Sequence, residues 1–189
     1  KAVADAKAAD TPEKRRGVGI AWGGFNVTEG GGDSAEVALE LMPGNKIRKY
    51  DTWHAMGQGA TTGSLVVTLE ALKEMHLTPE DIQLIQNDTK TCPDTGMAGA
   101  SRSLYMDGNA TIIAANKLLA AMRKEDGTLR TYDEMKAEGI ETKYLGRYET
   151  NTTPGLCRLD PNTGIGDPTP AFTYCLNLAE VEVDTKTGK

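Results

Sequence analysis

The sequence predicts an α+β fold, and three observations point to it. Residues 35–42 alternate between apolar and polar side chains, which is typical of a half-buried strand. Pro43-Gly44-Asn45 is a turn sequence, so residues 47–53 should return antiparallel to the first strand. Two segments with helical periodicity follow, at 61–76 and 100–123. We therefore expect an antiparallel β-meander with two long helices packed on one face, as a two-layer α/β sandwich in one compact unit.

The remaining elements are shorter. Residues 1–10 are rich in alanine and charged side chains, like the last turns of a helix, and residues 17–26 predict a mostly buried strand. Thr78-Pro79-Glu80-Asp81 predicts a single helical turn, and Thr131-x-x-Glu134 is a capping box that starts a short helix. Three further extended segments are expected, at 82–86, 140–150 and 171–184.

Each long helix has a predicted apolar side. In the first helix it consists of Leu65, Leu69, Leu72 and Met75. In the second it consists of Leu104, Ile112, Ala115, Leu118, Leu119 and Met122. Gly108 lies inside the second helix, where glycine costs about 1 kcal/mol relative to alanine, so we expect packing to favour a bare backbone there.

The composition excludes several classes of protein. The chain has 189 residues and a net charge of −6, with no large basic patch, which argues against nucleic-acid or anionic-membrane partners. Its three cysteines are scattered and form no C-x-x-C pair, so a disulfide framework, an iron–sulfur cluster or a zinc site is not expected. We expect a cytoplasmic protein.

Both ends of the sequence suggest a piece of a longer chain. Residues 1–16 look like the end of a preceding helix and a linker. A strand pattern near residue 184 runs into a hairpin-turn sequence with no return strand. We expect residues 17–189 to form a partial domain that is truncated at both ends.

One candidate site lies where the first long helix begins, at Met56-Gly57-Gln58-Gly59. Glycine allows a ligand to approach the backbone closely, and the first helical turn offers free N–H donors to an anion. Gln58 adds an amide that both donates and accepts hydrogen bonds. The alternative is a tight turn that simply starts the helix.

A second candidate site precedes the second long helix, in the run Gly99-Ala100-Ser101-Arg102-Ser103. Small residues let the chain lie flat against a ligand, the serines offer hydroxyl groups, and a helix N-terminus favours negative charge. Arg102 could neutralise a phosphate, although an arginine at such a position is more often solvent-facing. The alternative is a helix start built from small residues for packing.

Together these residues resemble the mononuclear molybdenum hydroxylases, the xanthine oxidase family, and are most similar to its bacterial aldehyde oxidoreductase branch. The resemblance rests on Met56-Gly57-Gln58-Gly59 and on its spacing to the T-x-P-x-T sequence, 91–95, and the alanine–serine run that follows. It continues through Asp107-Gly108 to the closing strand, residues 180–184, and covers nearly everything from Gly17 onward.

The resemblance implies a fragment of the molybdopterin-binding domain. It places the glutamine of the first site, Gln58, near molybdenum, and the second site around the pterin and its phosphates. The cofactor is expected to be molybdopterin cytosine dinucleotide, and its own sulfur atoms hold the metal, so no protein metal ligand is expected. The cofactor-binding residues implied are Gly57, Gln58, Gly59, Gly99, Ala100, Ser101, Arg102 and Ser103.

The resemblance also implies an activity that this chain does not perform alone. Members of the family oxidise aldehydes to carboxylic acids with oxygen derived from water, and a glutamate acts as the base. That glutamate and the iron–sulfur clusters are expected in parts of the protein outside this sequence. The expected partners are the rest of the parent polypeptide, a small aldehyde and, in the full-length protein, a second copy in a homodimer. Two alternatives stay open: a stand-alone phosphate- or nucleotide-binding module without redox activity, and a folded fragment that binds nothing.

Overall fold

The structure, a computed structural model, describes residues 1–27, 32–86, 88–150, 157 and 159–189. These residues form two compact units, one made of 1–25 with 172–189 and the other of 26–171. This differs from the one compact unit expected from the sequence. None of the described helices is long and apolar enough to cross a membrane.

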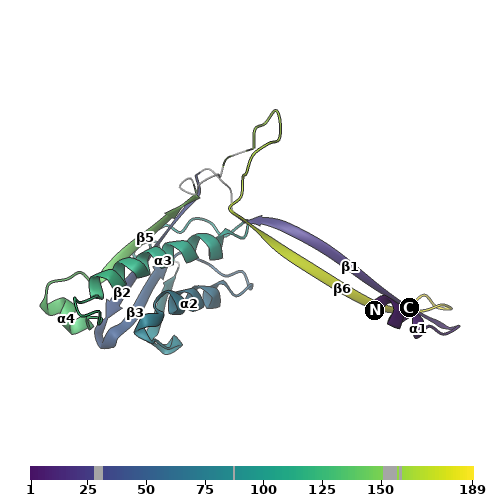
Figure 1. Cartoon of the computed structure of the whole chain (residues 1–189), viewed down its shortest axis with the longest axis horizontal. Coiled ribbons are helices and arrows are strands. Elements are labelled where there is room, and N and C mark those ends of the chain that lie inside the picture. The colour runs from purple at the N-terminus through teal and green to yellow at the C-terminus, as the bar shows by residue number, and fades with distance from the viewer. Residues whose placement is uncertain (28–31, 87, 151–156, 158) are drawn as a thin grey trace. The chain divides into compact units, whose positions relative to one another are not determined.

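The smaller unit is a two-stranded sheet with one short helix. Helix α1 spans Ala2–Ala8, and strand β1 (Lys14–Val27) pairs with strand β6 (Ala171–Asp184), as Figure 1 shows. Most residues of β1 are exposed, so the expectation of a mostly buried strand is wrong for the described structure. The reason is that a two-stranded sheet has two open faces, and within the described part of this unit most of either face is uncovered.

The larger unit contains a four-stranded sheet in the order β4-β3-β2-β5. Strand β2 (Ser34–Met42) and strand β3 (Lys46–Asp51) form the expected antiparallel hairpin through the turn η1 (Pro43–Asn45). Strand β5 (Lys143–Glu149) pairs antiparallel with β2 on the other side. In this turn Asn45 has a φ of 57°, in the left-handed region that asparagine tolerates better than most residues.

The sheet is mixed rather than a purely antiparallel meander. Strand β4 (Ile82–Gln86) runs parallel to β3 because a helical crossover connects them. The crossover consists of α2 (Ala60–Ala71) and the single turns η2 (Lys73–Met75) and η3 (Pro79–Asp81). The predicted capping box at the last turn is present, and the predicted combination of helices and strands is confirmed.

The long helix α3 (Arg102–Met122) lies against β2 and β5, and α2 packs against α3 (Figure 1). The short helix α4 (Tyr132–Ala137) begins with the predicted capping box between Thr131 and Glu134. The main core lies between the sheet and the helices. Its buried members are Leu39, Leu41, Ile47, Leu72, Ile82, Ala114, Ala115, Leu118, Leu119, Met122 and Met135.

The predicted apolar side is confirmed for the first long helix and is wrong in part for the second. Leu72 is buried, and Leu65, Leu69 and Met75 are partly buried against the main core. In α3, Leu104 is 57% exposed and Ile112 is 45% exposed, whereas Ala115, Leu118, Leu119 and Met122 are buried as predicted. Polar side chains also face inward, namely Asp107 and Thr111 on α3 and Ser64 and Thr68 on α2. Apolar periodicity does not reveal these buried polar positions.

One glycine controls the packing of α3 on the sheet. A Cβ atom at Gly146 in β5 would overlap the carbonyl oxygen of Ala110 and lie 2.6 Å from the backbone nitrogen of Ala114. The backbone of α3 therefore lies directly on β5. Gly108 in α3, where the sequence indicated a need for glycine, is different: a Cβ there would lie 3.8 Å from Val67, an ordinary contact.

The two glycines give opposite predictions. Gly146→Ala should destabilise the larger unit by about 3 kcal/mol or more, because two backbone segments would have to separate. Gly108→Ala should be neutral or stabilising by up to about 1 kcal/mol, because alanine favours the helix. Urea unfolding of the two variants measures the difference. Equal effects of the two substitutions would contradict the close contact between α3 and β5.

Candidate functional site

Both long helices begin without a side-chain cap. The N-cap residue of α2 is Gly59, with φ 84° and ψ 21°, and that of α3 is Ser101, with φ 53° and ψ 19°. Neither makes a side-chain hydrogen bond to the first turn, whereas Thr131 caps the short helix α4. The first-turn N–H groups of α2 and α3 are therefore not satisfied by an N-cap side chain.

At the first junction the backbone requires glycine for its conformation. Gly57 and Gly59 have φ angles of 97° and 84°, and a Cβ at either position would meet no atom within 4 Å. The exposed Gln58 lies between them, and its Oε1 accepts a hydrogen bond of 2.6 Å from the backbone N–H of Met56. No described residue is bonded to its amide NH₂ group. This junction presents open backbone and one amide donor.

At the second junction two successive residues are in the left-handed conformation without being glycine. Ala100 has a φ of 45° and Ser101 a φ of 53°, a combination that costs energy at each residue. Gly99, Ala100 and Ser103 are half-buried and Ser101 is exposed. The surrounding contacts hold this strained backbone in place. It sets the direction in which α3 begins at the junction.

Arg102 is not solvent-facing. Its side chain is 5% exposed, and its guanidinium binds both carboxylate oxygens of Asp33 at 2.7 and 2.8 Å. The remaining donors reach three backbone carbonyl oxygens, those of Ser34, Thr95 and Met97, at 2.7 to 2.8 Å. All five N–H donors of this guanidinium are thus used within the protein. The sequence offered Arg102 as a phosphate ligand, but the structure gives it an internal role, since it ties the loop before α3 to the start of β2.

A pair of threonines joins the two junctions. The Oγ1 of Thr95 accepts hydrogen bonds from the backbone N–H of Thr52 at 2.7 Å and from its hydroxyl at 2.8 Å. The backbone N–H of Thr95 in turn donates to Thr52 Oγ1 at 3.0 Å. Beside this pair is a shallow pocket with about 160 Å³ of empty space. It is lined by Thr52, Trp53, Thr95, Gly96, Ala98, Arg102 and Ser103.

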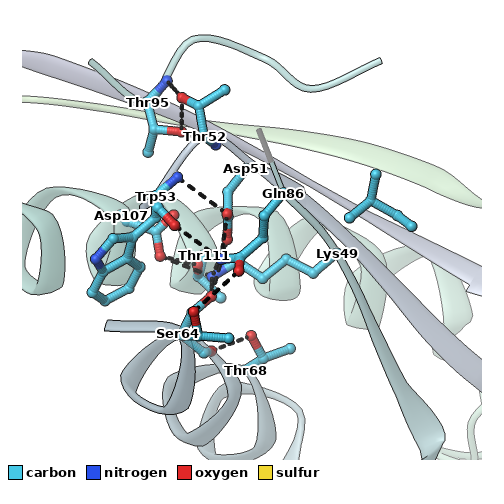
Figure 2. A network of polar contacts seen from close by, with 12 residues as sticks. Lys49, Asp51, Thr52, Trp53, Ser64, Thr68, Gln86, Thr95, Asp107 and Thr111 are labelled. Atoms are coloured by element: carbon cyan, nitrogen blue, oxygen red, sulfur yellow. Dashed lines mark hydrogen bonds and ion pairs between the residues drawn. The ribbon is translucent and has the colours of Figure 1, made fainter. Parts of the chain in front are cut away.

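Below the junctions lies a buried ionic network, shown in Figure 2. The ammonium group of Lys49 on β3 lies 2.7 Å from Ser64 Oγ on α2 and 2.8 Å from Asp107 Oδ2 on α3. It also lies 3.3 Å from Asp51 Oδ2, which accepts a hydrogen bond from Ser64 at 3.0 Å. All four side chains are fully buried. One lysine therefore links the central strand to both long helices.

The network extends to the chain that enters the first junction. Asp51 Oδ1 accepts hydrogen bonds from the backbone N–H of Trp53 at 3.2 Å and from the side chain of Gln86 at 2.8 Å. Gln86 also donates to the carbonyl oxygen of Trp53 and accepts from Thr61 on the first turn of α2. The backbone leading to Gln58 is thus held on both sides.

Asp107 is the strained member of this network. Its pKa is raised from 3.8 to about 6, chiefly because burial disfavours the charged form, with Lys49 opposing the shift, Asp51 adding to it and Thr111 opposing it. Its Oδ1 atom and Trp53 Nε1 are buried without a hydrogen-bond partner among the described residues. Two carboxylates share a single lysine, so a proton on Asp107 relieves the excess negative charge.

Sequence reasoning missed Lys49, Asp51, Asp107 and the two threonines. A signal was available in β3, because residues 47, 49, 51 and 53 face the same side of a strand. Two of these, Ile47 and Trp53, are apolar, so the charges of Lys49 and Asp51 had to face the core with them. Opposite charges on the inner face of a strand indicate a buried ion pair.

The raised pKa of Asp107 gives a pH-dependent stability. The folded chain binds the proton more tightly than the unfolded chain, so this stabilisation is present below pH 4 and is lost as the pH rises through about 6. Relative to Asp107→Asn, the wild-type chain should gain about 2 kcal/mol as the pH falls from about 7 to 4. Urea unfolding at a series of pH values measures this difference.

Asp126→Asn is the control, because hydrogen bonds from Thr128 lower the pKa of the exposed Asp126. Relative to Asp126→Asn, the wild-type chain should become less stable as the pH falls. This change is opposite in sign to the one expected for Asp107. A wild-type advantage over Asp107→Asn that did not change with pH would show that Asp107 is ionised throughout.

Comparisons with known proteins show the family to which this chain belongs. The sequence model of the molybdopterin cofactor-binding domain matches residues 1–189. The chain is 36% identical over 188 residues to an aldehyde oxidoreductase of Megalodesulfovibrio gigas. The alignment covers 100% of this chain and 20% of that protein. The chain thus spans about a fifth of that relative's length.

Two solved structures are similar over the chain. The aldehyde oxidoreductase of Desulfovibrio gigas superimposes with a TM-score of 0.89 at 36% identity, over 100% of this chain and 20% of that one. The enzyme of Desulfovibrio desulfuricans gives 0.85 at 38% identity, over 98% and 20%. The alternative of a stand-alone nucleotide-binding module finds no support in these relatives. The chain belongs to the molybdopterin cofactor-binding domain family, in the form found in aldehyde oxidoreductase-type enzymes of the xanthine oxidase family.

Proposed function

We propose that this chain forms one side of the molybdenum cofactor site of an aldehyde oxidoreductase. The start of α3, with Gly99, Ala100, Ser101 and Ser103, binds the phosphates of the cofactor. The first junction, with Gly57, Gln58 and Gly59, lies at the metal end of the pterin. Arg102 holds the phosphate-binding backbone in place, and its guanidinium makes no contact with the cofactor.

The observation that carries this proposal is the pair of uncapped helix starts, each with a left-handed N-cap residue. Free N–H donors at a helix start attract phosphate and other anions. The open space around Gly57 and Gly59 suits a cofactor that contacts backbone. The donor set of amide, hydroxyl and backbone N–H groups, without a cation, suits a ligand held mainly by hydrogen bonds.

The dinucleotide form of the cofactor also fits. A pyrophosphate carries more charge than the single phosphate of molybdopterin and gains more from a helix N-terminus. The pocket beside Thr52 and Thr95 is open to one side and does not enclose a ligand, unlike the clefts that bury most of a cofactor's surface. This chain therefore supplies one wall of the site, and the remaining walls come from other parts of the parent polypeptide.

The bound cofactor supplies the redox chemistry that oxidises an aldehyde to a carboxylic acid with oxygen from water. The residues of this chain bind and orient the cofactor, and the amide of Gln58 donates a hydrogen bond toward its metal end. The base of the reaction and the iron–sulfur clusters lie outside this chain. The parent protein is a cytoplasmic homodimer.

The partner nearest to this chain is the rest of its own polypeptide. Strand alternation places Ile20, Trp22, Phe172, Tyr174, Leu176 and Leu178 on one face of the β1–β6 sheet, the apolar face. These side chains are 55% to 71% exposed, and Trp22 stacks on Tyr174 with ring centroids 6.2 Å apart. Such a surface is normally covered, and the full-length relative is five times longer than this chain. A further part of the parent polypeptide covers the apolar face.

Substitution of Gln58 tests the cofactor site. In the full-length protein Gln58→Ala should leave the fold unchanged, because Gln58 is exposed. It should remove one or two hydrogen bonds worth about 0.5–1.5 kcal/mol each, and so lower the molybdenum content or the turnover by about twofold to a hundredfold. Metal analysis and steady-state rates measure both. Gln83→Ala, at an exposed glutamine on β4, is the control. Wild-type metal content with wild-type turnover in Gln58→Ala would assign Gln58 to the turn alone.

A second test concerns the apolar face. Leu176→Lys should increase the solubility of the chain produced alone and decrease the yield of folded full-length protein, because a charge would be buried at the covered face. Asn177→Lys places the same charge on the opposite face and should have the smaller effect on yield. Equal yields for the two full-length variants would argue against a covered apolar face.

A further inference from the structure

We propose that Lys49 is a positioning residue for the cofactor: its ammonium group sets the spacing between the two helix starts at which the cofactor binds. This inference rests on the proposed function, since it assigns a role within that same site. It concerns a side chain that the cofactor does not touch and that acts through α2 and α3.

The geometry of Lys49 carries the argument. Lys49 donates one hydrogen bond to each long helix, to Ser64 Oγ at 2.7 Å and to Asp107 Oδ2 at 2.8 Å, and forms an ion pair with Asp51 at 3.3 Å. Ser64 lies in the first half of α2 and Asp107 in the second turn of α3. An ammonium group on β3 with one acceptor on each helix fixes where both helices start relative to that strand.

The network reaches the first junction by hydrogen bonds and the second through the first turns of α3. On the side of α2, Asp51 and Gln86 hold Trp53 and Thr61, which flank the glycine-rich turn. On the side of α3, Asp107 is five residues after Arg102, whose guanidinium holds the carbonyl oxygens of Thr95 and Met97. A shift of Lys49 would therefore move both ligand-binding turns.

Stability alone gives no reason for this arrangement. Removing a charge from water costs several kcal/mol, and well-packed apolar side chains in the same place are often equally or more stable. An apolar pair, however, fills space without fixing direction, whereas a hydrogen-bonded ion fixes both distance and angle. The excess negative charge and the unpartnered Oδ1 atom of Asp107 add to the cost. The network therefore fixes the positions of the two helices relative to β3 but lowers the stability of the fold.

The decisive experiment compares full-length variants by their cofactor content and by their melting temperature. Lys49→Met removes the ammonium group at nearly constant side-chain length and leaves two carboxylates unpaired. Lys49→Met with Asp107→Leu replaces the lysine and one carboxylate by apolar side chains of similar size. Asp51 keeps its hydrogen bonds from Ser64, Gln86 and the backbone of Trp53, so this variant should regain part of the stability lost in Lys49→Met. Both proteins are purified, dialysed, and analysed for molybdenum and for pterin.

The expected result is that the double variant melts above Lys49→Met yet retains about tenfold less cofactor than the wild-type protein, a loss typical of residues that orient the groups contacting a ligand. A matched control is Met135→Ala on α4, whose fully buried side chain belongs to the same core. It should lower the melting temperature and leave the cofactor content unchanged. Ser64→Ala removes only one acceptor and should lower cofactor retention with little loss of stability.

Three outcomes overturn the proposal: wild-type cofactor content in a stable double variant, wild-type retention in Ser64→Ala, or an equal loss of cofactor in Met135→Ala. If the double variant does not fold, Ser64→Ala decides. A wild-type protein that contains no pterin refutes the proposed function and with it this role. Pterin in the wild-type protein at the same level as in the double variant refutes the role of Lys49 alone.

Discussion

The ammonium group of Lys49 is the contact that ties both long helices of the larger unit to its sheet. It joins β3, α2 and α3 at one point, among side chains that are fully buried. Because each partner of Lys49 must be polar, the inner faces of both helices carry hydroxyl and carboxylate groups at this end. The larger apolar core lies further along α3, and a smaller apolar cluster of Ala35, Val37, Met106 and Ala110 lies beside the network. The start of α3 thus combines apolar contacts with β2 and polar contacts with Lys49.

A second buried cation complements the first. Arg102 uses a planar guanidinium with five donors to bind Asp33 and three carbonyl oxygens, a task that suits its fixed fork geometry. Lys49 therefore fixes the helices, and Arg102 fixes the loop between β4 and α3. Thr52 and Thr95 connect the two sets of contacts through their reciprocal hydrogen bonds. The strained backbone at Ala100 and Ser101 is found where these contacts converge, which is the usual setting of functional sites.

Much of this fold could be predicted from the sequence. The hairpin at Pro43-Gly44-Asn45, the capping boxes and both long helices follow from local signals, which depend only on neighbouring residues. The parallel pairing of β4 and the exposure of β1 did not follow, because pairing and burial depend on contacts that are distant in the sequence. Gly146 was overlooked for the same reason: its need for a bare Cα comes from α3, more than thirty residues away.

The candidate site shows the same division. The two glycine-containing turns were found from residue type and spacing, and their roles as cofactor ligands stay a prediction. The positions that hold them, Lys49, Asp51, Asp107 and Arg102, were missed or misjudged, because each acts through partners on other elements. A buried charge is decided by its partner, and the sequence alone does not name that partner. The exposed apolar face of the β1–β6 sheet is a further case, since the partner proposed for it is not part of this chain.

The most direct measurement is an experimental structure of the full-length protein with its cofactor bound. The account predicts that the amide group of Gln58 and at least one first-turn N–H group of α3 each lie about 3 Å from an atom of the cofactor. It further predicts that the guanidinium of Arg102 stays on Asp33 and makes no phosphate contact. A cofactor bound with both helix starts beyond hydrogen-bond reach would contradict the account.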